Sequence, residues 1–178
     1  NFFIFMATKN ISYLHYIFYV LFFGMFLLTW KGFGFQFVFP NYPWLSNKGI
    51  GLFGGLTSFF ITTFTMSYLE IKRDNNRTLF SIFLGFLCTS FLVIIFSIFL
   101  PYSFSLFSFI MNALLILPTM LVINTAFYLK GFKPAKYYIL AFTAMVLGSI
   151  VTALMALGLF KANFFTTNAA LIGTCLEM

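Results

Sequence analysis

The residues able to do chemistry in this sequence are few and far apart. Its 178 residues include one histidine, His15, and three carboxylates, Glu70, Asp74 and Glu177. One histidine and one aspartate do not make up the Ser-His-Asp arrangement that activates a nucleophile. The sequence also contains no HExxH zinc motif and no phosphate-binding loop. We therefore expect no catalytic set, no metal site and no cofactor within these residues.

Two short patterns look like ligand sites but lie in the wrong surroundings. Residues 49–54, GIGLFG, match the GxGxxG dinucleotide fingerprint, which requires a preceding strand and an α/β unit. Here an aromatic loop precedes the motif and an apolar stretch follows it, so its glycines are expected to let helices pack closely. Cys88 and Cys175 lie in apolar stretches without a CxxC motif or a neighbouring His, which indicates neither a metal site nor a structural disulfide.

Four polar residues in apolar stretches are the candidates for a signal relay. Glu177 is expected to lie within the bilayer, where an ionisable residue costs about 2.5 kcal/mol or more and is a functional hypothesis by default. Asn112 and Asn124 share one apolar stretch with Pro118, which should kink the helix. They are about 120° apart around it, and either helix–helix contact or a switch would explain them. The fourth candidate is Asn168, for which capping a helix is the simpler interpretation.

The composition identifies an integral membrane protein. Hydrophobic residues make up 62% of the chain and charged residues 7%, against about 25% charged residues in soluble domains. At roughly 20 residues for each membrane span, the chain has room for six or seven helices in a single domain. The net charge of +7 is explained by basic residues at the ends of spans, so nucleic acid is not an expected partner.

The sequence predicts an all-α, polytopic helix bundle with five complete and two partial spans. Residues 1–6 are interpreted as the tail of a first helix, and 168–178 as the start of a seventh that is cut short. Between 31 and 49, Pro40 and Pro43 are expected to break any helix. The complete spans are predicted at residues 12–30, 50–70, 79–100, 105–129 and 137–158.

The distribution of Lys and Arg predicts the orientation of these spans. One set of span ends carries seven basic residues and the other carries three, which places the first set in the cytoplasm. The N-terminal side is then extracytoplasmic, and the C-terminal helix runs inward. The larger set is Lys9, Lys72, Arg73, Arg77, Lys130, Lys133 and Lys136, and the smaller is Lys31, Lys48 and Lys161.

Three stretches resemble one known family. Residues 32–49 contain an aromatic-Gln-aromatic run before Pro and Trp-Leu, 67–77 end a span with Tyr-Leu and a charged loop, and 168–178 read NAALIGTCLEM. The sequence resembles the membrane domain of bacterial seven-transmembrane receptors with diverse intracellular signalling modules. That resemblance implies an extracytoplasmic sensory domain before the first helix. It also implies a histidine kinase, diguanylate cyclase or phosphatase module after the seventh, and a homodimer.

We therefore expect residues 1–178 to be a sensory domain in a bacterial inner membrane, which contacts lipids, an unknown extracytoplasmic ligand and a cytoplasmic module of the same chain. A shift of the seventh helix would carry the signal. The candidate outer site is Phe35, Gln36, Asn41 and Trp44, although Trp44 would also suit an interfacial anchor. The alternative is a small polytopic transporter or channel, for which the helix broken at Pro118 is a partial match.

Overall fold

The computed structural model describes residues 6, 9–74, 76–131, 135–156 and 158–177, and every element in this part of the chain is a helix. This confirms the all-α fold. In chain order the helices are α2 (Ile11–Trp30), the π-helical turn η1 (Gly34–Val38), α3 (Pro43–Tyr68), α4 (Arg77–Phe99), α5 (Tyr102–Leu129), α6 (Ala135–Ala156) and α7 (Phe164–Glu177).

Four of the described helices are long and apolar enough to cross a membrane. They comprise α2, α3 from Asn47 onward, α4 and α5. Helix α6 has 22 residues, which span about 33 Å at 1.5 Å per residue, and its apolar part runs from Phe142 to Thr152. Helices satisfy their own backbone hydrogen bonds, which is what a bilayer core without water requires.

The link between α2 and α3 differs from the prediction. The break predicted at Pro43 is wrong: this proline is the first residue of α3, which therefore begins seven residues before Ile50. Proline is tolerated there because the first helical N–H has no partner within the helix anyway. Pro40 does lie in the short non-helical break between η1 and α3.

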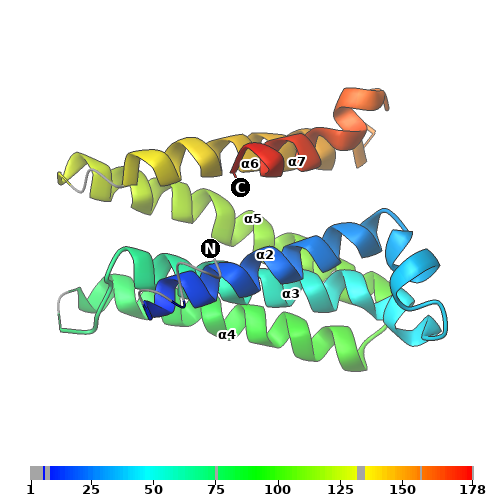
Figure 1. The fold of residues 1–178 in the computed structure, drawn as a ribbon, viewed down its shortest axis with the longest axis horizontal. Helices are drawn as coiled ribbons and strands as arrows, with labels where there is room; N and C mark the ends of the chain where they lie inside the picture. Colours follow the sequence, from blue (N-terminus) through cyan, green and yellow to red (C-terminus); the bar gives the residue numbers. More distant parts are fainter. Residues whose placement is uncertain (1–5, 7–8, 75, 132–134, 157, 178) are drawn as a thin grey trace. The chain divides into compact units, whose positions relative to one another are not determined.

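The chain forms two compact units, residues 1–116 and 117–178, and the division falls inside α5 next to Pro118. In the first unit α2 packs on α3 and α3 packs on α4 (Figure 1). His15 near the start of α2 contacts Ser67 near the end of α3, and Lys48 near the start of α3 donates a hydrogen bond to the carbonyl of Leu100 after α4. Successive helices are therefore antiparallel.

Aromatic rings and glycines fill the contacts within the first unit. Phe60 of α3 meets Phe18 and Phe22 of α2, with ring centroids 5.0 and 5.3 Å apart. A Cβ atom at Gly54 would lie 2.5 Å from the ring of Phe109, and one at Gly55 would lie 2.9 Å from Ile94 Cγ1. The interpretation of GIGLFG as a helix-packing motif is thereby confirmed.

Most hydroxyl groups of the spans are hydrogen-bonded to their own helix. Thr62 donates to the carbonyl of Ser58 at 2.7 Å, and Thr65 donates to that of Ile61 at 2.8 Å. The same bond to the carbonyl four residues earlier recurs on every helix from α2 to α7. Examples are Thr29, Ser81, Ser97, Ser108, Thr125, Thr143, Ser149, Thr152 and Thr167.

Candidate functional site

The predicted outer-site residues lie on the link between α2 and α3 and at the start of α3. Phe35, Gln36, Asn41 and Trp44 are all exposed. Trp44 belongs to the first turn of α3 and not to a loop. The four side chains share one end of the first unit, but the groove described below is formed elsewhere and contains none of them.

One aromatic residue holds this link against α3. Phe39 is only 5% exposed, and its ring centroid lies 6.3 Å from that of Phe53. Its ring packs so closely on Gly34 that a Cβ atom there would lie 2.6 Å from Phe39 Cζ. The link is therefore fixed by one inward side chain, while its neighbours Phe37 and Val38 point outward.

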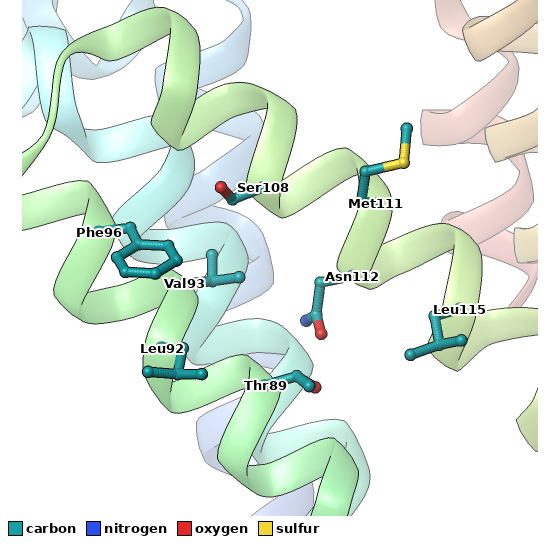
Figure 2. Close-up of a pocket in the computed structure, with 8 residues that line it drawn as sticks. All are labelled: Thr89, Leu92, Val93, Phe96, Ser108, Met111, Asn112 and Leu115. Carbon is teal, nitrogen blue, oxygen red and sulfur yellow. The ribbon is translucent and has the colours of Figure 1, made fainter.

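Asn112 lines a groove between α4 and the first half of α5, with a volume of about 270 Å³. Figure 2 shows its amide directed from α5 towards α4. The Nδ2 group donates to Ser90 Oγ at 3.3 Å, whereas Oδ1 has no hydrogen-bond partner among the described residues. The other lining residues are Thr89, Leu92, Val93, Phe96, Ser108, Met111 and Leu115.

The unpaired oxygen of Asn112 gives the groove a definite chemical character. The residue is 5% exposed, and an unsatisfied buried polar group costs about 1–3 kcal/mol. A second arrangement that supplies a donor to this oxygen would recover part of that cost. The groove therefore offers a hydrogen-bond acceptor within apolar walls, which suits either a helix contact or a switch.

Asn124 is buried in a different way. Its Nδ2 group donates to the carbonyl of Met120 at 2.7 Å, one turn earlier on the same helix. Its Oδ1 atom also has no partner in the described part of the chain. Asn112 belongs to the first unit and Asn124 to the second, so the two relay candidates are not parts of one site within either unit.

Pro118 lies on α5 between these two asparagines, inside a helix that continues through it. Proline has no N–H to donate, so the carbonyl four residues earlier, at Leu114, loses its normal helical partner. The backbone hydrogen bond that α5 lacks therefore falls within a few residues of the division into two units.

Helices α6 and α7 pack backbone against backbone. A Cβ atom at Gly148 would overlap the carbonyl of Ala169, and one at Gly173 would overlap the carbonyl of Ala144. The contact is antiparallel, because Thr167 of α7 meets Met155 of α6 at 3.7 Å. The sequence interpretation missed this contact, although Ala-xxx-Gly at 144–148 and again at 169–173 is the small-residue spacing that predicts it.

The end of the chain differs from the prediction in one respect. Helix α7 begins at Phe164, and its N-terminal cap is Asn163, whose Oδ1 accepts from the backbone N–H of Thr166 at 2.9 Å. The alternative role of Asn168 as that cap is therefore wrong. Asn168 lies on the helix and donates to the carbonyl of Phe164 at 2.9 Å.

Glu177 is the last described residue of α7, nearly four turns from its start,. Its side chain, like that of Cys175, lies outside what the structure describes. The role predicted for Glu177 therefore stays a prediction.

The single histidine has a local partner. His15 Nδ1 lies 3.0 Å from Ser67 Oγ, and the residue is half-buried. Among the described residues, no group of three or more His, Cys, Asp and Glu lies close enough to hold a metal ion. The contact between His15 and Ser67 is therefore interpreted as a hydrogen bond between α2 and α3.

The fold defines a multi-pass α-helical membrane protein in which side-chain hydrogen bonds between Asn112 and Ser90 and between His15 and Ser67 join neighbouring helices. A family model described as "7TM diverse intracellular signalling" matches residues 1–178, the whole chain, and the chain belongs to this family. The resemblance found in the sequence is thereby confirmed. No curated protein and no solved structure shows a significant match.

Proposed function

We propose that this chain is a membrane-embedded sensory domain that relays an extracytoplasmic signal to an intracellular signalling module of the same protein. The observation that carries the proposal is the family match over all 178 residues. A histidine kinase, a diguanylate cyclase or a phosphatase is the proposed output. The proposed location is the inner membrane of a bacterium, and the proposed assembly is a homodimer.

The proposed orientation places the N-terminal side outside the cell and the C-terminal side in the cytoplasm. Antiparallel packing in the first unit supports it, because Lys72 and Arg73 follow α3 at the end where α2 begins. Lys31 and Lys48 lie at the opposite end, after α2 and near the start of α3. With Lys9 and Arg77 at the first of these ends, the first unit carries four basic residues on the proposed cytoplasmic side and two on the other, which is the bias that the positive-inside rule describes.

The proposed mechanism is a displacement of α7 together with α6. The glycine contacts leave no space for one helix to slide past the other without separating their backbones. A signal that moves α7 would then carry the α6–α7 pair as one body. Pro118, at the division of the two units, is the proposed hinge, since its missing hydrogen bond lowers the cost of bending α5.

A ligand or partner can drive such a change only if it binds one arrangement more tightly than the other. The proposed outer site is Phe35, Gln36, Asn41 and Trp44, whose side chains are exposed at one end of the first unit. The proposed relay residues are Asn112, Asn124, Asn168 and Glu177. Within the described part of the chain, the amide oxygens of Asn112 and Asn124 have no hydrogen-bond partner, and the proposed second arrangement supplies a donor to one or both of them.

The test begins with the coding sequence on either side of residues 1–178. A soluble signalling module in frame after residue 178 would identify the output reaction. The activity of that module is then measured in membranes for the full-length protein carrying Glu177→Gln, with Asp74→Asn as the matched control because Asp74 lies in the polar loop after α3. Altered output with Glu177→Gln alone supports the relay, and unchanged output removes Glu177 from it.

A second candidate function is transport of a small solute. Two observations favour it: α5 contains Pro118, and buried asparagines with unpaired oxygens lie on either side of that proline. Substrate sites in transporters often form where a helix is interrupted near the bilayer midplane, and α5, which continues through Pro118, matches this pattern only in part. Solute flux into liposomes that contain only residues 1–178 would support transport, provided that Asn112→Leu or Asn124→Leu abolishes it.

A further inference from the structure

The link between α2 and α3 carries a dense set of exposed apolar side chains. We call residues 33–44 the aromatic segment; Figure 1 shows it as the blue-to-cyan turns that join α2 to α3. The sequence contains no charged residue between Lys31 and Lys48. The exposed large apolar side chains of the aromatic segment are Phe33, Phe35, Phe37, Val38, Tyr42 and Trp44. Phe37 is 75% exposed and Tyr42 67% exposed, and the polar Gln36 and Asn41 are exposed among them.

The helices on either side of the aromatic segment indicate where it would lie in a membrane. It begins three residues after Trp30, where α2 ends, and its last two residues, Pro43 and Trp44, open α3. Since α2 and α3 are both long and apolar enough to cross the bilayer, the residues that join them lie at its edge. Phe39 holds the segment onto Gly34 and Phe53, so it cannot extend freely into the water.

Exposure of this apolar surface to water is unfavourable. Exposed apolar patches of this kind mark contact with a membrane, a ligand or a partner protein. Trp and Tyr are enriched at the boundary between the headgroups and the acyl chains because their rings are amphipathic. Tyr42 and Trp44 lie where the chain enters α3. Lipid is the favoured neighbour because the exposed apolar side chains at the end of α2, Leu28 and Trp30, lead along the chain into the segment.

We propose that the aromatic segment lies in the plane of the membrane and binds phospholipid at the Trp30 end of the bundle. Phe33 and Phe37, which are neighbouring exposed rings, contact the acyl chains, and Tyr42 and Trp44 lie at the level of the headgroups. The segment is then an in-plane anchor that fixes the depth of α2 and α3. This assignment concerns lipid contact only and holds whether or not the domain transmits a signal.

The experiment uses residues 1–178 reconstituted in phosphatidylcholine liposomes. The two native tryptophans, Trp30 and Trp44, are replaced by Phe, and Phe37→Trp is introduced as the single tryptophan, which is excited selectively at a wavelength where tyrosine does not absorb. Its emission is recorded with aqueous iodide and with lipids brominated at shallow or deep positions of the acyl chain. Phe91→Trp on the exposed face of α4 serves as the lipid control, and Asp74→Trp in the polar loop serves as the aqueous control.

The expected result is that Phe37→Trp loses fluorescence to brominated lipid as Phe91→Trp does and resists iodide. Emission at longer wavelength with iodide quenching equal to that of Asp74→Trp would overturn the proposal, because the segment would then face water. Resistance to both quenchers would also overturn it, since a second copy or another protein surface would then cover the segment.

A second measurement keeps the native aromatic segment intact. Trp30→Phe alone leaves Trp44 as the only tryptophan, at a position that is 52% exposed. Stronger quenching of Trp44 by the shallow bromine label than by the deep one supports its place among the headgroups. Quenching by iodide alone contradicts it.

Discussion

The two units hold their helices together by different means. In the first unit, helices meet through aromatic rings, as Phe60 does with Phe18 and Phe22. In the second, α6 and α7 meet through glycine and alanine at the level of the backbone. Rings can change rotamer and repack, whereas a backbone contact has no such freedom. The comparison assigns adjustable packing to the first unit and rigid coupling to the α6–α7 pair.

The largest effect should follow from Gly148→Leu. The added side chain must separate α6 from α7, because the carbonyl of Ala169 already occupies the place of its Cβ atom. Overpacking usually costs up to about 3 kcal/mol, and we expect Gly148→Leu to lower the free energy of unfolding by at least that much. The measurement is unfolding in mixed micelles. Gly85→Leu is the control, since nothing lies within 4 Å of a Cβ atom at Gly85; an equal loss in both variants would contradict backbone packing.

The difference between the units is sharpened by adding a single methyl group to each. Gly148→Ala meets a backbone carbonyl, whereas Gly54→Ala meets the movable ring of Phe109. We expect about 1–3 kcal/mol of destabilisation for Gly148→Ala and a smaller cost for Gly54→Ala. Thermal unfolding of both variants checks the order. A larger cost at Gly54 would show that the aromatic contacts are the less adjustable ones.

The N-terminal cap of α7 should contribute an intermediate amount to the stability of that helix. Asn163→Ala removes the acceptor of the Thr166 N–H bond, and loss of such a cap costs about 1 kcal/mol. Hydrogen exchange of the first-turn amides of α7 should accelerate accordingly. Asn168→Ala is the matched control, because Asn168 donates to a carbonyl already within the helix. Equal acceleration in both variants would argue against a specific cap.

The smallest effect concerns Asn112 and Ser90. Their hydrogen bond is long, at 3.3 Å, and side-chain hydrogen bonds between membrane helices average about 0.6 kcal/mol. A double-mutant cycle with Ser90→Ala and Asn112→Leu should therefore give a coupling energy near that value. A coupling energy several times larger would mean that Asn112 fixes α4 to α5 and is not available as a switch.

The sequence was sufficient for the spans but not for the contacts between them. Apolar composition alone predicts α2, α4 and most of α5, because a bilayer leaves a long apolar stretch few alternatives to a helix. The early start of α3 at Pro43 and the π-helical turn at 34–38 depend on how Phe39 packs on Gly34 and Phe53. Phe39, Gly34 and Phe53 meet only in the folded protein, so their packing cannot be predicted from the hydrophobic periodicity of the sequence.

The sequence predicted which kinds of residue form the candidate site, but it did not predict which of them contact one another. Asn112 was singled out as a buried polar residue, but its partner Ser90 is 22 positions away on another helix. Nothing in the spacing of the two residues indicates the pairing. The contact of α6 with α7 was within reach, because small residues recur four positions apart on both helices.

The hydroxyl groups that bond to a carbonyl of their own helix have a consequence for insertion of the protein into the membrane during synthesis. A threonine bonded to its own helix, such as Thr62 or Thr65, needs no neighbour when its helix leaves the translocon. These hydroxyl groups therefore do not require a neighbouring helix to be present when their span enters lipid. Asn112 is an exception, and its partner Ser90 lies on α4, the helix synthesised just before α5. Ser90, the acceptor, is therefore synthesised before Asn112, whose Nδ2 group donates to it.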